Sequence, residues 1–200
     1  MKKIYQSAIL LPFLMSMVIL SYIVYALLSA ENGLVNNTIL PLLHIDPIQW
    51  YQKPKYWPAI LIIANCWKGV GYGCLIYIAS LIGIDPTYYE AARLDGATKW
   101  QEITKITLPC LVPTIITLLL LSIGRIFYSD VGLFYQVPMN SGVLFPTTNV
   151  IDTYVYRALI EQGNISMSSA AGVYQSLVGF VIVMLSNWIV RRVDKDRALF

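Results

Sequence analysis

The sequence predicts an all-α membrane protein, a polytopic bundle of four transmembrane helices. Its composition is the first reason: hydrophobic residues make up 57% of the 200 residues and charged residues only 12%, whereas an ordinary soluble domain is about a quarter charged. The mean hydropathy of +0.62 agrees. A chain of this composition lacks the polar groups to cover its own surface, so we expect lipid around it.

Four apolar stretches are the second reason, because a membrane helix needs about 20 mostly apolar residues. They run from about residue 8 to 28, 57 to 82, 106 to 126 and 170 to 190. The first is too long for the apolar core of a signal peptide and has no small-residue cleavage site, so we expect it to be a span. The remaining segments are too short for a soluble domain, and we expect one membrane domain over residues 1–200.

The positions of Lys and Arg predict the orientation, because cytoplasmic segments are enriched in these residues. If the N-terminus is inside, the inner segments hold nine of them and the outer loops three. The sequence therefore predicts that both termini and the loop of residues 83–105 are cytoplasmic. The inner residues are Lys2, Lys3, Arg93, Lys99, Lys105, Arg191, Arg192, Lys195 and Arg197, and the outer ones are Lys53, Lys55 and Arg157.

The outer loops carry aromatic residues, turn formers and one short helical pattern. In the first loop, Trp50, Tyr51, Tyr56 and Trp57 are typical of an interfacial aromatic belt. In the second, the segment IDTYVYRALIEQG predicts a short helix. Asn36-Asn37-Thr38 matches the glycosylation acceptor pattern, which is common by chance and carries little weight.

The loop of residues 83–105 has the clearest local signals. Asp85 followed by Pro86 predicts a helix start, and Gly96 predicts its end. Thr98, with Gln101 three residues later, predicts a second short helix that begins with a capping box. Two interpretations remain open on physical grounds: a solvated loop with ordinary charges, or a short helical hairpin whose small alanines allow a partner to approach closely.

A family resemblance favours the second interpretation. Glu90-Ala91-Ala92, followed by Gly96, Ile106 and Leu108-Pro109, resembles the EAA loop of ABC importer permeases. The segments IANCWKGVGYGCLIYIASLIGIDPTYYEAARLDGA, IDTYVYR and LSNWIVRR resemble the permeases of the carbohydrate-uptake class, in the LplB-like oligosaccharide branch. The resemblance extends over essentially the whole chain.

The resemblance implies an ABC type-1 permease fold and a part in ATP-driven sugar or oligosaccharide import across a bacterial cell membrane. The loop would be a coupling helix bound to a cytoplasmic ABC ATPase, with Glu90, Ala91, Ala92 and Gly96 as coupling residues. The other implied partners are a second permease subunit and an extracellular lipid-anchored sugar-binding protein. ATP and Mg²⁺ would be used by the ATPase, because this chain has no GxxxxGK[ST] phosphate loop.

Polar residues within the second span are candidates for the transport pathway. A charge near the middle of a span costs roughly 2.5–3.5 kcal/mol, so Lys68 should face the bundle interior or water. Two readings stay open: a pathway residue that contacts sugar together with Asn65 and Trp67, or a structural lysine bonded to backbone carbonyls between helices. The single His44 and the three cysteines in or beside apolar stretches indicate no metal site and no catalytic residue.

Permeases of this family are longer, with about six spans, so the fold predicted here is incomplete. A misassigned start codon, a truncated gene or a separately supplied N-terminal part would each explain the difference. A transport-inactive permease fragment is therefore an alternative function. An unrelated intramembrane enzyme is a remote alternative, because the acidic residues fall outside the spans and no catalytic arrangement is present within them.

Overall fold

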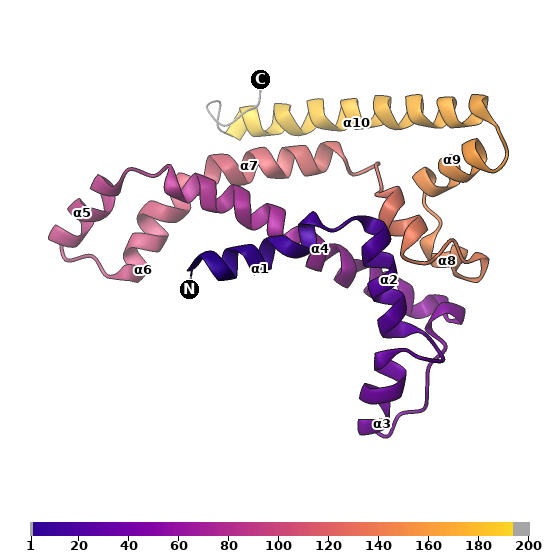
Figure 1. The fold of residues 1–200 in the computed structure, drawn as a ribbon. Coiled ribbons are helices and arrows are strands. Elements are labelled where there is room, and N and C mark those ends of the chain that lie inside the picture. Colours follow the sequence, from indigo (N-terminus) through magenta and orange to yellow (C-terminus); the bar gives the residue numbers. More distant parts are fainter. Residues whose placement is uncertain (1, 194–200) are drawn as a thin grey trace. The chain divides into compact units, whose positions relative to one another are not determined.

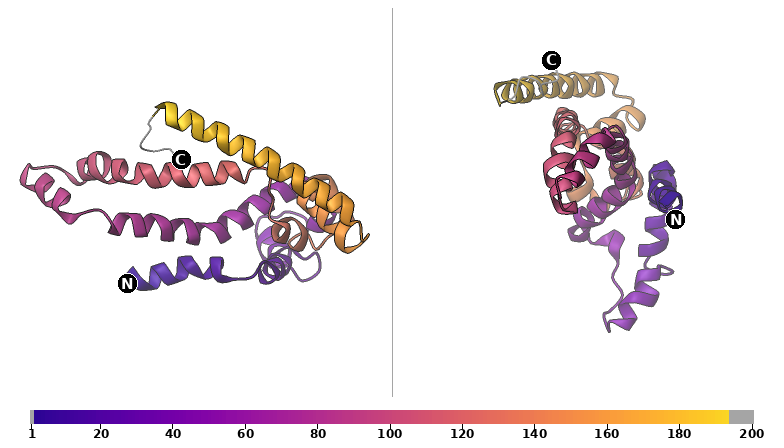
Figure 2. Two further views of the ribbon diagram at one scale, coloured as in Figure 1. Left: turned by 90° about the horizontal axis from the view of Figure 1, so that it is seen from above. Right: turned by 90° about the vertical axis from the view of Figure 1, so that its left-hand side faces the viewer.

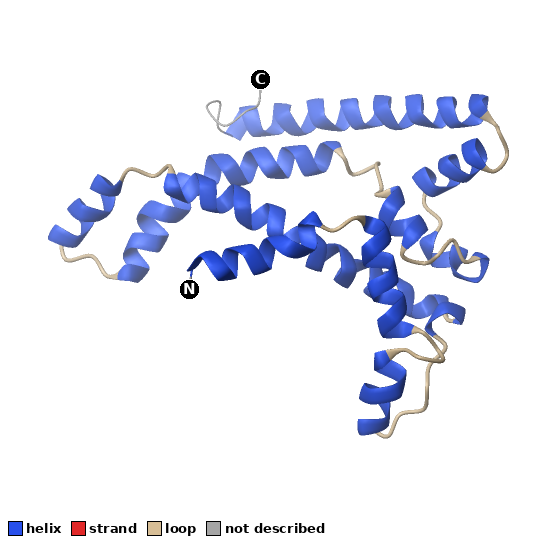
Figure 3. Ribbon diagram, in the orientation of Figure 1, coloured by secondary structure: helices blue, strands red, loops and turns tan. Residues whose placement is uncertain are grey.

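The computed structural model describes residues 2–193, and the regular elements in that range are all helical (Figures 1 and 3). Side chains are described for residues 7–192, so the side chains of Lys2, Lys3, Lys195 and Arg197 lie outside the described part. The chain divides into two compact units. The first comprises Met1–Gly71 and Tyr128–Gln175, and the second Tyr72–Phe127 and Ser176–Phe200.

The first predicted span is a broken helix. The predicted span of about residues 8–28 is formed by α1 (Lys2–Leu14) and α2 (Met17–Leu28), which meet at an angle of 100°. Pro12 lacks the N–H that would continue the helical ladder. Ser16 is extended, with φ −68° and ψ 157°, and its side chain accepts a hydrogen bond from the amide of Ile19 at 3.2 Å. An N-cap in this position starts a new helix in a new direction.

Three further helical segments are long and apolar enough to cross a membrane: Pro54–Ile82, Lys99–Gly124 and Ile165–Arg192. With the bent pair counted as one span, the described residues hold up to four. The segments contain α4 (Trp57–Ile82), α7 (Leu108–Gly124) and α10 (Ile165–Val193). In the second unit, Ser80 of α4 and Thr114 of α7 share a hydrogen bond of 3.0 Å.

The core of the first unit is built around Trp57, which is fully buried among Leu20, Val24 and Leu61. Tyr51 packs edge-on against Trp57, with ring centroids 4.9 Å apart, and its hydroxyl donates to the carbonyl of Val137 at 3.3 Å. Trp57 is thus a core residue and Tyr51 packs half-buried against it, under the segment that contains Val137. The depth of these two predicted belt residues in the membrane stays a prediction.

Short helical elements make up the rest of the first unit, and α9 occupies the segment for which a short helix was predicted. In α9, Arg157 donates to Asn140 at 3.1 Å and to Asn149, and its guanidinium lies 4.3 Å from the ring centroid of Phe145. The elements are η1 (Val35–Ile39), α3 (Leu40–Leu42), η2 (Trp50–Gln52), η3 (Pro54–Tyr56), η5 (Gly132–Gln136), η6 (Gly142–Leu144), α8 (Phe145–Thr148) and α9 (Ile151–Ile160).

Asn36 holds the loop between α2 and α4 in place. Its side chain is 1% exposed. The amide nitrogen donates to the carbonyls of Ser29 and Ile48 at 3.2 and 2.9 Å. The amide oxygen accepts from the backbone N–H of Ile48 at 3.2 Å and from the indole of Trp50 at 3.0 Å. All four hydrogen bonds that this side chain offers are thus used inside the protein, which leaves no accessible amide for glycosylation.

We expect Asn36→Ala to lower the free energy of unfolding by about 2–4 kcal/mol, because it leaves several buried polar groups without partners. The measurement is the apparent melting temperature of the purified protein in detergent. Asn37→Ala is the matched control, since Asn37 makes one exposed hydrogen bond, to Glu31. Equal shifts for the two variants would contradict this account of the loop.

Candidate functional site

A helical hairpin joins α4 to α7 in the second unit. It consists of α5 (Pro86–Leu94), α6 (Lys99–Glu102) and the π-helical turn η4 (Ile103–Thr107). Figure 2 shows it at the ends of the two long helices that it joins. The predicted coupling residues all lie on this α5–α6 hairpin, and its geometry follows closely from its local sequence.

The hairpin begins at the cap predicted from sequence. Asp85 Oδ1 accepts a hydrogen bond from the backbone N–H of Thr87 at 2.9 Å, and Pro86 is the first helical residue. This backbone hydrogen bond lowers the pKa of Asp85, because it stabilises the charged carboxylate. The stabilisation that this cap gives is therefore fully present at a pH above the ordinary pKa of an aspartate, about 3.9. It is lost as the pH falls through the lowered pKa.

Helix α5 ends in a Schellman motif at Gly96. The N–H of Gly96 donates to the carbonyl of Arg93 at 3.1 Å, and the N–H of Ala97 donates to the carbonyl of Ala92 at 2.9 Å. Gly96 has a φ of +78°, which residues with a side chain adopt only with strain. The prediction that this glycine makes the turn is confirmed.

The second helix starts with the predicted capping box. Thr98 Oγ1 accepts from the backbone N–H of Gln101 at 3.4 Å, and Gln101 Oε1 accepts from the backbone N–H of Thr98 at 2.7 Å. Two amides at the start of α6 are therefore satisfied by side chains. With the Schellman motif at Gly96, two residues before Thr98, the whole turn between α5 and α6 has a defined backbone.

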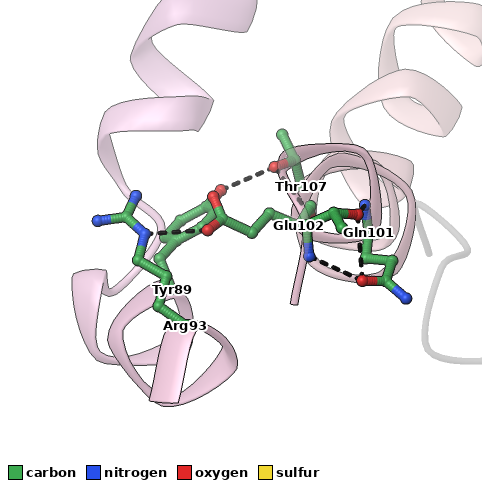
Figure 4. Close-up of polar contacts among 6 residues, drawn as sticks. Tyr89, Arg93, Gln101, Glu102 and Thr107 are labelled. Atoms are coloured by element: carbon green, nitrogen blue, oxygen red, sulfur yellow. Dashed lines mark hydrogen bonds and ion pairs between the residues drawn. The ribbon is translucent and has the colours of Figure 1, made fainter. Parts of the chain in front are cut away.

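Two side-chain contacts close the hairpin (Figure 4). Arg93 Nε and Glu102 Oε1 are 2.9 Å apart, and this hydrogen bond raises the pKa of Arg93. The hydroxyl of Thr107 donates to the carbonyl of Glu102 at 3.3 Å and is 2.9 Å from the hydroxyl of Tyr89. Because Arg93 is 66% exposed, the ion pair contributes little stability by itself. The contacts from two successive turns of α5 together fix its direction relative to α6.

The outer surface of the hairpin presents large apolar side chains. Leu94 is 90% exposed, Trp100 72% and Tyr88 59%. The helical run of 26 residues that starts at Lys99 is about 39 Å long, more than the hydrocarbon core of about 30 Å. Since its charged residues, Lys99, Glu102 and Lys105, all fall in the first turns, the hairpin lies outside that core. Large apolar side chains exposed in this position are available for contact with another surface.

The predicted coupling residues lie close to these apolar side chains. Glu90 and Ala91 are exposed. The charge of Glu90 also raises the pKa of Arg93, but less than Glu102 does. Ala92 and Gly96 line a recess of about 360 Å³ between α5 and the start of α6. The sequence analysis missed Tyr89, Glu102 and Thr107 as the residues that close the hairpin. Their contacts join residues 9 and 18 positions apart, and no local pattern signals such pairs.

Of the predicted pathway residues, Asn65 and Trp67 line different recesses, and Lys68 contacts the backbone of another helix. Asn65 lines a recess with Leu133 and Thr147, and Trp67 lines an apolar cavity of about 380 Å³ with Leu20 and Val24. Lys68 is half-buried, and its ammonium donates to the backbone carbonyls of Phe13, at 3.0 Å, and Met15. The structure thus favours the structural reading of Lys68. Among the described residues, no group of three His, Cys, Asp or Glu could hold a metal ion.

Comparison with known proteins identifies the family. Residues 3–195 match the family described as the binding-protein-dependent transport system inner membrane component. The chain belongs to this family.

Individual members of the family show the same relationship. The chain is 31% identical over 195 residues to the polygalacturonan/rhamnogalacturonan transport system permease protein YteP of Bacillus subtilis, and 30% identical to Protein LplB of the same organism. Each alignment covers 98% of this chain and 60% of the relative. A chain in the crystal structure of a bacterial alginate ABC transporter superposes with a TM-score of 0.86 at 36% identity, covering 96% of this chain and 66% of that one. The chain thus spans about three fifths of the length of its curated relatives.

We expect Gly96→Ala to loosen the α5–α6 hairpin by about 1–2 kcal/mol, because alanine at a positive φ is strained. No atom lies within 4 Å of the added Cβ, so strain alone produces the effect. Hydrogen exchange at the amides of Gly96 and Ala97 measures it. Gly96→Asn is the control, since asparagine adopts this conformation more readily and should exchange more slowly than the alanine variant. Identical exchange in both variants would contradict the role of the positive φ.

Proposed function

We propose that this chain is a permease part of an ATP-driven, binding-protein-dependent importer of sugars or oligosaccharides, and that its α5–α6 hairpin binds a cytoplasmic ATPase. Its family membership supports the transport role. The observation that carries the coupling role is the exposed apolar surface of Tyr88, Leu94 and Trp100 on a hairpin that is capped at both helix starts and closed by side-chain contacts.

The rigidity of the hairpin is what coupling requires. A helix that enters a groove on a partner transmits the partner's movement only if it does not bend at its own base. Arg93 contacts Glu102 of α6 and Tyr89 contacts Thr107 of η4, in the helical run that continues into α7, so a displacement of α5 would become a displacement of the span. In such a cycle, ATP binding closes the ATPase subunits, and the permease halves rock between inward-open and outward-open states. ATP hydrolysis would belong to the ATPase.

The other partners and the orientation complete the proposal. The excess of inner Lys and Arg supports cytoplasmic termini and a cytoplasmic hairpin. A second permease subunit would complete the translocation pathway, and an extracellular sugar-binding protein would deliver the substrate. The names of relatives support a carbohydrate substrate: polygalacturonan and rhamnogalacturonan for one, lactose for another. The matching alginate transporter was solved with a pentasaccharide-bound periplasmic protein.

A transport-inactive permease fragment is the second candidate, and the 60% coverage of the relatives is the observation that favours it. Intact-mass analysis of the tagged protein from native membranes separates the two. A chain well above 22.5 kDa, isolated with an ATPase and a second permease, supports the importer. A chain of 22.5 kDa without an ATPase supports the fragment.

We expect Leu94→Gln and Trp100→Gln each to reduce co-purification of the ATPase, and sugar uptake, roughly tenfold, because exposed apolar anchors dominate the energy of such interfaces. Pull-down with a tagged permease and uptake of labelled oligosaccharide measure the two effects. Glu90→Lys, which reverses the charge beside Arg93, should act in the same direction.

Ile45→Gln is the matched control, because Ile45 is 46% exposed but lies in the loop between α2 and α4. It should leave ATPase binding unchanged. Retention of the ATPase by the Leu94, Trp100 and Glu90 variants would rule out the hairpin as the docking element.

A further inference from the structure

Lys68 lies at the centre of its membrane span. The span covers Pro54–Ile82, so Lys68 is 14 residues from either end, or about 21 Å along the helix axis. A charge at this depth has a large insertion cost and marks a residue with a specific partner. The structure shows one salt bridge among the described side chains, and it joins Arg93 to Glu102. Lys68 therefore has no carboxylate partner among those side chains.

The partners of Lys68 are backbone carbonyls at the break between α1 and α2. The ammonium donates to the carbonyl oxygens of Phe13, at 3.0 Å, and Met15, and lies 5.9 Å from the ring centroid of Phe13. The last carbonyls of a helix have no partner within the helix and carry the negative end of its dipole. In a bilayer no water is available to satisfy them. Lys68 of α4 therefore acts as a charged cap on the C-terminal end of α1.

Gly71, one turn further along α4, allows this contact. A Cβ at residue 71 would lie 2.6 Å from the carbonyl oxygen of Ile9 and 3.2 Å from the Cβ of Phe13. The backbone of α1 therefore rests directly on α4 at this glycine. Residues three apart share one face of a helix, so Gly71 and Lys68 form a single surface, which we call the α1 seat.

We propose that Lys68 is a positioning residue for transport: through the α1 seat, it holds the broken first span at its bend while the permease changes conformation. The transport part of this inference rests on the proposed function. Lys68 makes this contact through hydrogen bonds to carbonyl dipoles, so the bend is held without a buried carboxylate partner. Broken helices near the membrane midplane are common in transporters.

The test uses the full-length permease, assembled with its ATPase in lipid nanodiscs and in vesicles. Lys68→Met keeps the length of the side chain but removes the donors, whereas Lys68→Arg keeps the charge and several N–H groups. Hydrogen exchange at the amides of Met15, Ile19 and Leu20 reports the break, since these donate to Pro12 and Ser16. We expect roughly tenfold faster exchange in Lys68→Met and recovery in Lys68→Arg.

Sugar uptake distinguishes positioning from substrate contact. We expect Lys68→Met to lower kcat at an unchanged KM, with recovery in Lys68→Arg. Gly71→Ala should give the same pattern with Lys68 still present, because the added Cβ displaces α1 from the seat. Lys55→Met, which removes an exposed lysine from the outer loop, is the control and should change neither measurement.

Unchanged exchange in both Lys68→Met and Gly71→Ala would overturn the inference. A raised KM at unchanged kcat would overturn it as well, and would assign Lys68 to the sugar pathway. If the unsubstituted assembly takes up no sugar, the proposed function fails, and the exchange measurements still decide whether Lys68 holds the break.

Discussion

A backbone polar group in hydrocarbon has no water to bind, and this constraint explains the polar contacts at the break in the first span. Each place where the chain stops being a regular helix must supply hydrogen-bond partners from the protein. At the break between α1 and α2, Ser16 satisfies the amide of Ile19, and Lys68 binds the carbonyls of Phe13 and Met15. In the loop that follows, the single side chain of Asn36 serves three backbone groups. The polar residues of this unit thus lie where the backbone needs them.

In the hairpin of the second unit, side chains also satisfy backbone groups at the helix ends, here outside the hydrocarbon core. Its helix starts are capped by Asp85 and Thr98, and its turn is closed by the Schellman motif at Gly96. None of these contacts buries much surface, so they fix the directions of the two helices more than they raise the stability of the hairpin. The apolar side chains, by contrast, are left outside, on Leu94 and Trp100. The polar groups of the hairpin thus determine its shape, and its exposed apolar groups are the part that the proposed docking would use.

The hairpin was predictable from sequence, whereas the packing of the first unit was not. The signals at Asp85-Pro86, Gly96 and Thr98-Gln101 are local, since each cap depends on residues no more than five positions apart, and the structure has all three. The break at Ser16 was missed because the residues on both sides are apolar, which conceals the effect of Pro12. The burial of Trp57 and Tyr51 depends on Val137, about 80 positions away, and the partners of Lys68 are more than 50 positions away. Contacts at such separations follow from the fold and leave no periodic pattern.

Polar contacts determine how these helices pack together, because apolar packing between helices contributes little to that choice in a membrane. Lipid chains are as apolar as leucine, so burying one helix against another gains little by removing apolar surface from its surroundings. The apolar windows of the three continuous spans are only 11–17% buried within the chain. Under these conditions a close backbone approach at Gly71 and a pair of hydrogen bonds from Lys68 determine which face of α4 receives α1. The mid-span lysine therefore has a structural reason to be there before any sugar is considered, and the part in transport that we propose for it rests on the helix it holds.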